Sequence, residues 1–331
     1  IFIALITYCL APIVSTQPSW FYVMVIVTVL LLTELKHTFT EFAQRMKNDE
    51  MITLAKFLAI SGIILPMLPH KNLIPDINLT PYSIWLATVV VSGISYLSYL
   101  LKRYVFHESG VLVSGIIGGL YSSTATISVL ARKSRKASEQ EANEYVAAML
   151  LAVSMMFLRF MILILIFSRE IFTSIYPYLL IMSVVAAVVA WFIHSRHRRS
   201  KDMTDESEDE DSSNPLEFKV ALIFATLFVV FTVLTHYTLV YAGTGGLNLL
   251  SFVSGLSDIT PFILNLLQNT GSVAVLVVVA CSMQAIISNI LVNMFYALFF
   301  AGKGSKLRPW ILGGFGTVIG VNLVLLLFFY L

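Results

Sequence analysis

One polar cluster in this sequence is a run of hydroxyl side chains inside an apolar segment. The stretch GGLYSSTAT places two glycines and a tyrosine before four hydroxyl residues: Ser122, Ser123, Thr124 and Thr126. Glycines permit a sharp turn, and hydroxyls can bond the backbone groups that a turn releases or can line a wet cavity. Helix packing is the alternative, because Gly115 and Gly119 form a GxxxG pair that favours close helix contact.

Charged side chains also occur within apolar segments. Arg159 lies in MMFLRFMIL, and Asp258 and Thr260 lie in SGLSDITPFI. A charge at membrane depth is costly and normally has a partner or water beside it. We therefore expect Arg159 and Asp258 to face one central polar site, and a purely structural salt bridge is the alternative. Asn289 and Asn293 are four residues apart, so they share a helix face and add either ligand contacts or interhelical hydrogen bonds.

Other kinds of chemistry have little support in the sequence. We find no His-Cys metal cluster and no hydrolase triad, and GKGS at 302–305 lacks the first glycine of a phosphate-binding loop. We therefore expect no enzymatic activity, no cofactor and no nucleic-acid partner. If a metal ion binds, Asp258 is the best candidate ligand.

The elements that must position these residues are apolar helices. The chain has 331 residues, of which 58% are hydrophobic and 12% charged, whereas a soluble domain is about half apolar and a quarter charged. Runs of about 20 apolar residues can cross a bilayer. We predict an all-α polytopic membrane protein with apolar segments at 1–14, 18–35, 51–68, 82–101, 110–131, 145–168, 176–194, 217–241, 247–267, 271–300 and 309–331.

The distribution of Lys and Arg decides which segments cross. If all eleven cross, the basic residues divide almost evenly between the two sides. If 110–131 and 247–267 enter and leave on the same side, 17 of the 21 basic residues fall on one side, and only Lys71 and Arg169 on the other. Membrane proteins concentrate basic residues on the cytoplasmic side. We therefore predict nine crossing helices and two re-entrant or broken segments, with loops 36–50, 102–109, 132–144, 195–216 and 302–308 cytoplasmic.

The two segments that do not cross resemble each other. Gly119-Leu120 aligns with Gly255-Leu256, and small polar residues follow in both. The charge count gives the two units opposite orientations, which predicts an inverted repeat, a recurrent transporter architecture. The predicted parts are N-terminal helices at 1–47, a first membrane half at 48–199, an acidic loop at 200–216 and a second membrane half at 217–331.

Several stretches resemble one family. They are LKHTF at 35–39, LPMLP at 65–69, the helix at 84–103, GIIGGLYSSTATISVLARKSR at 115–135 and FLR at 157–159. The chain resembles the membrane domain of unknown function of MgtC/SapB-type proteins of bacteria and archaea. The resemblance implies a multi-pass protein of the prokaryotic cytoplasmic (inner) membrane. Because the family often carries an MgtC-like portion upstream, residues 1–47 could be its tail, and we expect the chain to continue before Ile1.

The resemblance also marks two departures. Similar proteins tend to have a Gly-Leu-x-Asp-x-Asp tip, where Asp258 matches the first acid and Thr260 replaces the second. They also tend to have Asn followed by Lys four residues later, where Asn289 matches and Asn293 replaces the lysine. The resemblance therefore does not carry over to this chain a role that needs two acids or that lysine.

Two functions remain open at this point. The first is a transporter or channel for an ion or small polar solute. Its site would contain the four hydroxyl residues of GGLYSSTAT together with Arg159, Asp258, Thr260, Asn289 and Asn293. The second is a non-transporting regulatory or assembly protein, with the lipid bilayer and another membrane protein or a second copy of the chain as partners. Its GxxxG pairs, Gly115/Gly119 and Gly316/Gly320, would then be partner surfaces.

Overall fold

A computed structural model provides the structure of the protein. It describes residues 8, 23–30, 48–74, 77–106, 110–135, 137, 139–195, 218–268, 273–301 and 307–330. The predicted segments 1–14 and 18–35 lie mostly outside the described residues, and the acidic loop 200–216 lies wholly outside them.

The chain divides into two compact units, Ile1–Ile60 and Ser61–Leu331. The first unit contains α3 (Asn48–Ala59), and a π-helical turn (Ile60–Ile64) follows it in sequence. The described part of the second unit contains helices and the segments that connect them, with one isolated bridge between Ile74 and Ile77. Its α-helices are α4 (Leu65–Met67), α5 (Pro81–Leu100), α6 (Val111–Lys133), α7 (Glu139–Phe167), α8 (Arg169–Ser195), α9 (Phe218–Ser254), α10 (Thr260–Gln268), α11 (Val275–Ala301) and α12 (Arg308–Tyr330), and a π-helix at Leu101–Val105 extends α5.

Seven helices in the described part of the chain are long and apolar enough to cross a membrane. They are α5 with its π-helical extension, α6, α7, α8, α9, α11 and α12. Large apolar side chains are exposed on the outer faces, including Val184, Val188 and Trp191 of α8. Such a surface is unfavourable in water and suits lipid. The prediction of an all-α polytopic membrane protein is therefore confirmed.

Local sequence signals explain where several helices begin and bend. At the start of α5, the Thr80 hydroxyl accepts a hydrogen bond from the Ser83 amide, and the Ser83 hydroxyl accepts one from the Thr80 amide. Pro81 occupies the first turn, where its missing N–H costs nothing. Within α9, Gly243 has φ of 58° and ψ of −153°, a conformation open essentially only to glycine. The break predicted between the apolar segments 217–241 and 247–267 therefore appears as a reversal of α9.

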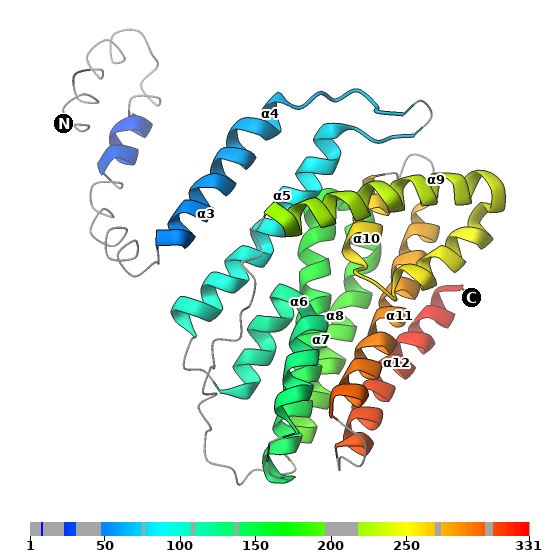
Figure 1. Ribbon diagram of the computed structural model, residues 1–331. Helices are drawn as coiled ribbons and strands as arrows, with labels where there is room; N and C mark the ends of the chain where they lie inside the picture. Colours follow the sequence, from blue (N-terminus) through cyan, green and yellow to red (C-terminus); the bar gives the residue numbers. More distant parts are fainter. Residues whose placement is uncertain are drawn as a thin grey trace. The chain divides into compact units, whose positions relative to one another are not determined.

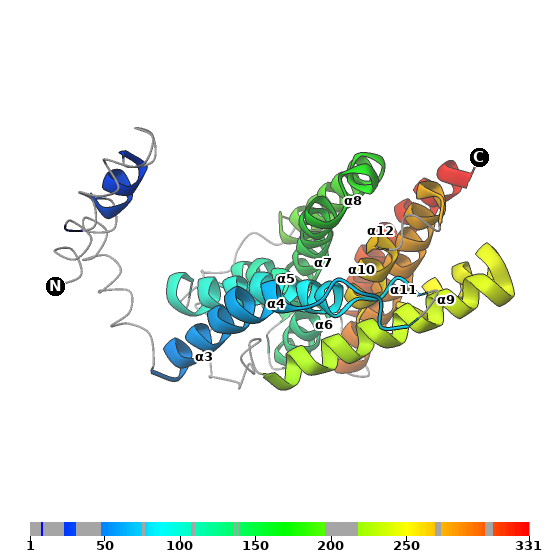
Figure 2. The same cartoon turned by 90° about the horizontal axis from the view of Figure 1, so that it is seen from above.

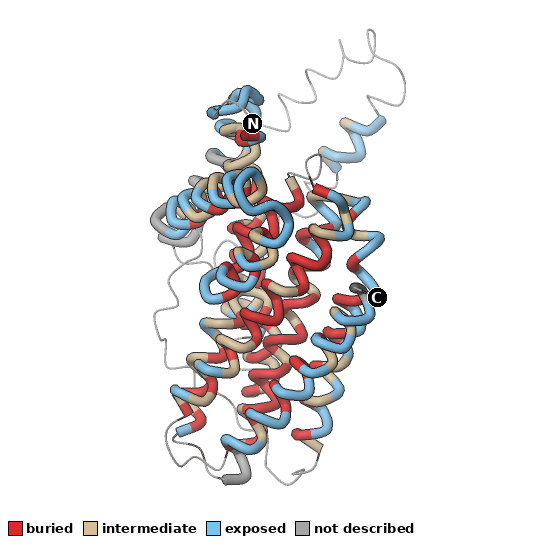
Figure 3. Tube along the Cα trace, turned by 90° about the vertical axis from the view of Figure 1, so that its right-hand side faces the viewer, coloured by how far each residue is buried: buried red, intermediate tan, exposed pale blue. Residues whose placement is uncertain are grey.

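The centre of the second unit is formed by α7 and α11. Buried positions gather along its middle, and exposed positions along its outer helices (Figure 3). Helix α7 packs against α6 and α8, and α11 packs against α12, α9 and α6. A hydroxyl pair joins α7 and α8: Ser154 of α7 and Ser183 of α8 each donate to the other's backbone carbonyl, at 2.8 and 3.1 Å.

The ends of the helices fix the direction of the chain within the second unit. Arg135, just after α6, donates to the carbonyl of Phe299 at 3.2 Å and to that of Phe300, near the end of α11. Gln268, the last residue of α10, donates to the Ser83 carbonyl in the first turn of α5 at 3.4 Å. Helices α7 and α11 thus run in opposite directions, and α9 crosses them obliquely before it reverses (Figures 1 and 2).

Candidate functional site

Helix α6 folds back on itself at Ser122. Ser122 has extended backbone angles, φ of −159° and ψ of 108°, between two helical halves. A Cβ atom placed on Gly118 would lie 2.5 Å from the Thr126 hydroxyl oxygen, whereas residues eight apart in one straight helix are separated by about 12 Å. The Ser122 hydroxyl accepts a hydrogen bond from the Ala125 amide at 3.3 Å and so caps the second half.

Helix α7 supports this fold-back. A Cβ atom on Gly115 would lie 2.4 Å from the Ala148 carbonyl oxygen, and one on Gly119 would lie 2.5 Å from the Ala152 Cα. The GxxxG pair is therefore used for close packing within the chain, so the prediction that it is a partner surface is wrong. Arg159 of α7 donates from Nη1 to the Tyr121 carbonyl at 2.7 Å, where the first half of α6 ends.

The second interruption lies between α9 and α10. Helix α9 ends at Ser254 and α10 begins at Thr260, with non-helical residues between them. The Asp258 carboxylate accepts a hydrogen bond from the Thr260 amide at 2.9 Å, which fixes the entry into α10. Asn289 of α11 donates to the carbonyls of Gly255 and Ser257 at 3.3 and 3.4 Å.

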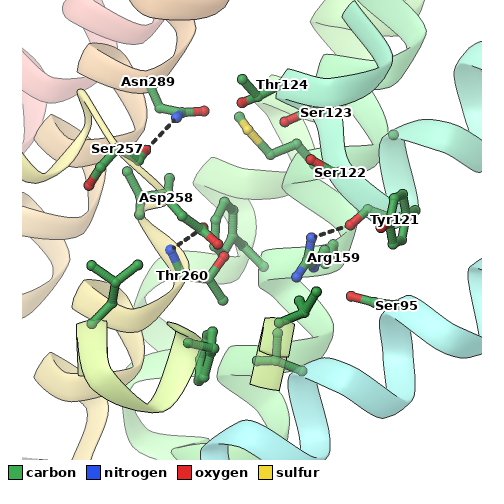
Figure 4. Close-up of a pocket in the computed structure, with 18 of the residues that line it drawn as sticks. Ser95, Tyr121, Ser122, Ser123, Thr124, Arg159, Ser257, Asp258, Thr260 and Asn289 are labelled. Atoms are coloured by element: carbon green, nitrogen blue, oxygen red, sulfur yellow. Dashed lines mark hydrogen bonds between the residues drawn. The ribbon is translucent and has the colours of Figure 1, made fainter. Parts of the chain in front are cut away.

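Both interruptions line one cavity of about 460 Å³ (Figure 4). In the close-up, Ser257, Asp258 and Thr260 lie on one side, and Tyr121, Ser122, Ser123 and Arg159 lie on the other. The rest of the wall comes from α5, α7, α9 and α11. The size is typical of a pocket for a small molecule.

Seven of the nine predicted site residues line this cavity: Ser122, Ser123, Thr124, Arg159, Asp258, Thr260 and Asn289. Thr126 is not among the lining residues, because the fold-back sets its side chain against Gly118. Asn293 also lies outside the lining, buried one turn along α11, and donates to the Asn289 Oδ1 atom at 3.1 Å. It supports Asn289 rather than facing the cavity.

Five polar residues of the cavity were missed by sequence reasoning: Ser92, Ser95, Tyr121, Ser257 and Tyr296. Ser92 and Ser95 of α5 line it, and both are buried. Their spacing of three residues places them on one helix face, and this was the available signal. It is weak, because serine is common at helix contacts in membranes.

Arg159 and Asp258 face the same cavity without forming a salt bridge, although both belong to the described residues. The Arg159 Nε atom is buried and has no hydrogen-bond partner. Asp258 is exposed to the cavity. No group of three or more His, Cys, Asp or Glu side chains that could hold a metal occurs among the described residues.

Comparisons with known proteins agree with a membrane domain of this kind. Residues 89–301 match the family described as "Domain of unknown function (DUF4010)", a span that includes both interruptions. A relative from Aquifex aeolicus (strain VF5), named "Uncharacterized protein", is 27% identical over 221 residues, which cover 66% of this chain and 94% of the relative. No solved structure matches the chain. Since the family match covers more than half of its residues, the chain belongs to the DUF4010 family.

Proposed function

We propose that the protein is a transporter or channel for an ion or small polar solute, with its central site in the cavity at the two interruptions. The observation that carries this proposal is that two broken helices, far apart in sequence, present polar groups to one cavity. Irregular backbone at membrane depth is tolerated where it lines such a cavity. A chain that only packed against a partner would gain nothing from exposing a charge there.

An inverted repeat of the two broken segments is part of the proposal, and their backbone contacts support it. In the alignment of the two segments, Tyr121 corresponds to Ser257. The carbonyl of Tyr121 accepts a hydrogen bond from Arg159 of the following long helix, and the carbonyl of Ser257 accepts one from Asn289 of its own following long helix. Equivalent breaks are thus held in equivalent ways.

The exits of the two segments also agree with inversion. The end of α6 lies beside the end of α11, whereas α10 ends shortly before α11 begins. Helix α11 has 27 residues, which span about 40 Å. The two broken segments therefore leave at opposite ends of the second unit, as two inverted half-sites of a transporter would.

The same proposal includes a location. The bias of basic residues favours an orientation with the end of α6 and the end of α11 on the cytoplasmic side. The resemblance to MgtC/SapB-type proteins favours a prokaryotic cytoplasmic membrane.

Flux through the purified protein in liposomes tests the proposal. Monovalent and divalent cations, anions and small neutral or zwitterionic solutes would be screened for wild type, Asp258→Asn and Ser123→Ala. Glu170→Gln and Ser174→Ala are matched controls, because both residues are exposed on α8. Flux that falls in the two cavity variants and persists in the controls is the expected result. Absence of flux for every class of solute would count against transport.

A regulatory or assembly role of the MgtC/SapB type is the second candidate. One observation favours it: Gly316 and Gly320 of α12 have nothing within 4 Å of an added Cβ atom, so this face has room for a partner helix. If no solute moves and Gly316→Leu disrupts a complex, the regulatory reading replaces transport.

A further inference from the structure

The cavity contains one positive and one negative charge, and the two do not form a salt bridge with each other. Arg159 and Asp258 are the only side chains that are charged at neutral pH among the described residues of its lining, and no salt bridge joins them. The formal charge of the lining is therefore zero. A lone ion would leave an unbalanced charge in a region of low dielectric, whereas a solute that carries both charges would not.

The side of the cavity formed by α6 and α7 suits a carboxylate. The Arg159 guanidinium has five N–H donors; one bonds the Tyr121 carbonyl, and the buried Nε has no partner. The Ser123 hydroxyl and the start of the second half of α6 line the same side. Unpaired amides at a helix start favour negative charge.

The opposite side suits an ammonium group. Asp258 uses Oδ1 to accept the Thr260 amide, and its carboxylate is otherwise exposed to the cavity. Charge-assisted hydrogen bonds from an ammonium group to a carboxylate are among the stronger polar contacts in proteins.

A third wall is apolar. Val220, Ile223, Phe224 and Leu227 line the cavity at intervals that share one face of α9. The volume of about 460 Å³ is far larger than a bare ion requires. A small organic solute with an apolar part fits both the volume and this wall.

From these three walls we propose that the solute is an amino-acid-like zwitterion with an apolar side chain. Its carboxylate faces Arg159, its ammonium group faces Asp258, and its side chain lies against α9. This inference rests on the proposed transport function of the same cavity, and it names the class of solute.

Binding of matched probes to the purified full chain tests the inference. The probes are L-leucine, 3-methylbutylamine, which lacks the carboxylate, and 4-methylpentanoate, which lacks the amino group. Calorimetry should show wild type binding leucine at least about tenfold more tightly than either analogue, because each analogue leaves one charge of the cavity unpaired.

Two variants should change the preference in opposite directions. Asp258→Asn should weaken the binding of leucine by about tenfold or more, and the binding of 4-methylpentanoate should be unchanged or tighter. Arg159→Gln should also weaken the binding of leucine, whereas the binding of 3-methylbutylamine should be unchanged or tighter. If Asp258 and Arg159 had a purely structural role, each substitution would weaken the binding of all three probes to a similar extent. Glu170→Gln serves as the control, and melting curves confirm folding. If Arg159→Gln does not fold, the wild-type comparison and Asp258→Asn still decide.

The inference is overturned if wild type binds a singly charged analogue as tightly as leucine, or if Asp258→Asn weakens leucine and 4-methylpentanoate equally. If the flux screen finds an inorganic ion carried while leucine neither binds nor competes, transport stands and the zwitterion is excluded. If no solute is bound or carried, both proposals are wrong.

Discussion

Arg159 holds the Tyr121 carbonyl at 2.7 Å, at the point where α6 reverses its direction. The bond joins a positive charge within α7 to the backbone group that the fold-back releases. Arg159 thus has a structural role in addition to its proposed contact with solute, so the two interpretations of this residue do not exclude each other.

Removing the donors of Arg159 should lower stability. Arg159→Met removes the hydrogen bond that the Tyr121 carbonyl accepts from the guanidinium, at an expected cost of about 1–3 kcal/mol. Arg159→Lys retains one possible donor and should lose less. Arg169→Met, at an exposed position on α8, should change the melting temperature little. Equal melting temperatures for Arg159→Met and wild type would show that the hydrogen bond does not stabilise the fold-back.

The close contact between α6 and α7 predicts that alanine substitution lowers stability at a glycine in this contact but not at a glycine outside it. Gly119→Ala would place a methyl group 2.5 Å from the Ala152 Cα, and such overpacking costs about 1–3 kcal/mol. Gly313→Ala on α12 meets nothing within 4 Å and should leave stability unchanged or raise it by up to about 1 kcal/mol. Thermal unfolding in one detergent measures both. Similar values for the two variants would contradict the packing of α6 on α7.

Two variants of Asp258 separate the role of its charge from the role of its hydrogen bond with the Thr260 amide. Asp258→Asn retains an oxygen that can accept the Thr260 amide, so its stability should be close to that of wild type. Asp258→Ala loses this acceptor and should cost about 1 kcal/mol more. Both variants should lose transport, because both lack the charge. Full transport by Asp258→Asn would remove the carboxylate from the mechanism.

The fold-back of α6 predicts which loops share a side of the membrane. Cysteines placed at Phe106 and Ala137, before and after α6, should react with an impermeant thiol reagent from the same side. A cysteine at Lys71 should react from the other side, because α5 lies between Lys71 and Phe106. Labelling of the Phe106 and Ala137 positions from opposite faces would mean that α6 crosses the membrane.

The sequence alone located both interruptions because each combines glycine with short polar side chains in an otherwise apolar run. It placed Asp258 at a tip for the same reason. It failed for Thr126, because an extended residue at Ser122 changes which way the following turn faces. It failed for Ser92 and Ser95, since their role depends on which helices surround the cavity. The apolar wall from α9 also could not be predicted from the sequence, because it depends on the oblique path of that helix.

The most direct test of the central claim is the reactivity of the two tips toward a small water-soluble thiol reagent. Ser123→Cys and Ser257→Cys would be made separately in a background with Cys9 and Cys281 replaced by alanine. Lys71→Cys is the exposed control, and Thr317→Cys is the lipid-facing control. If one hydrated cavity serves transport, both tip cysteines should react, and the solute found in the flux screen should protect both. Two unreactive tips beside a reactive Lys71→Cys, or protection of one tip alone, would contradict a shared site.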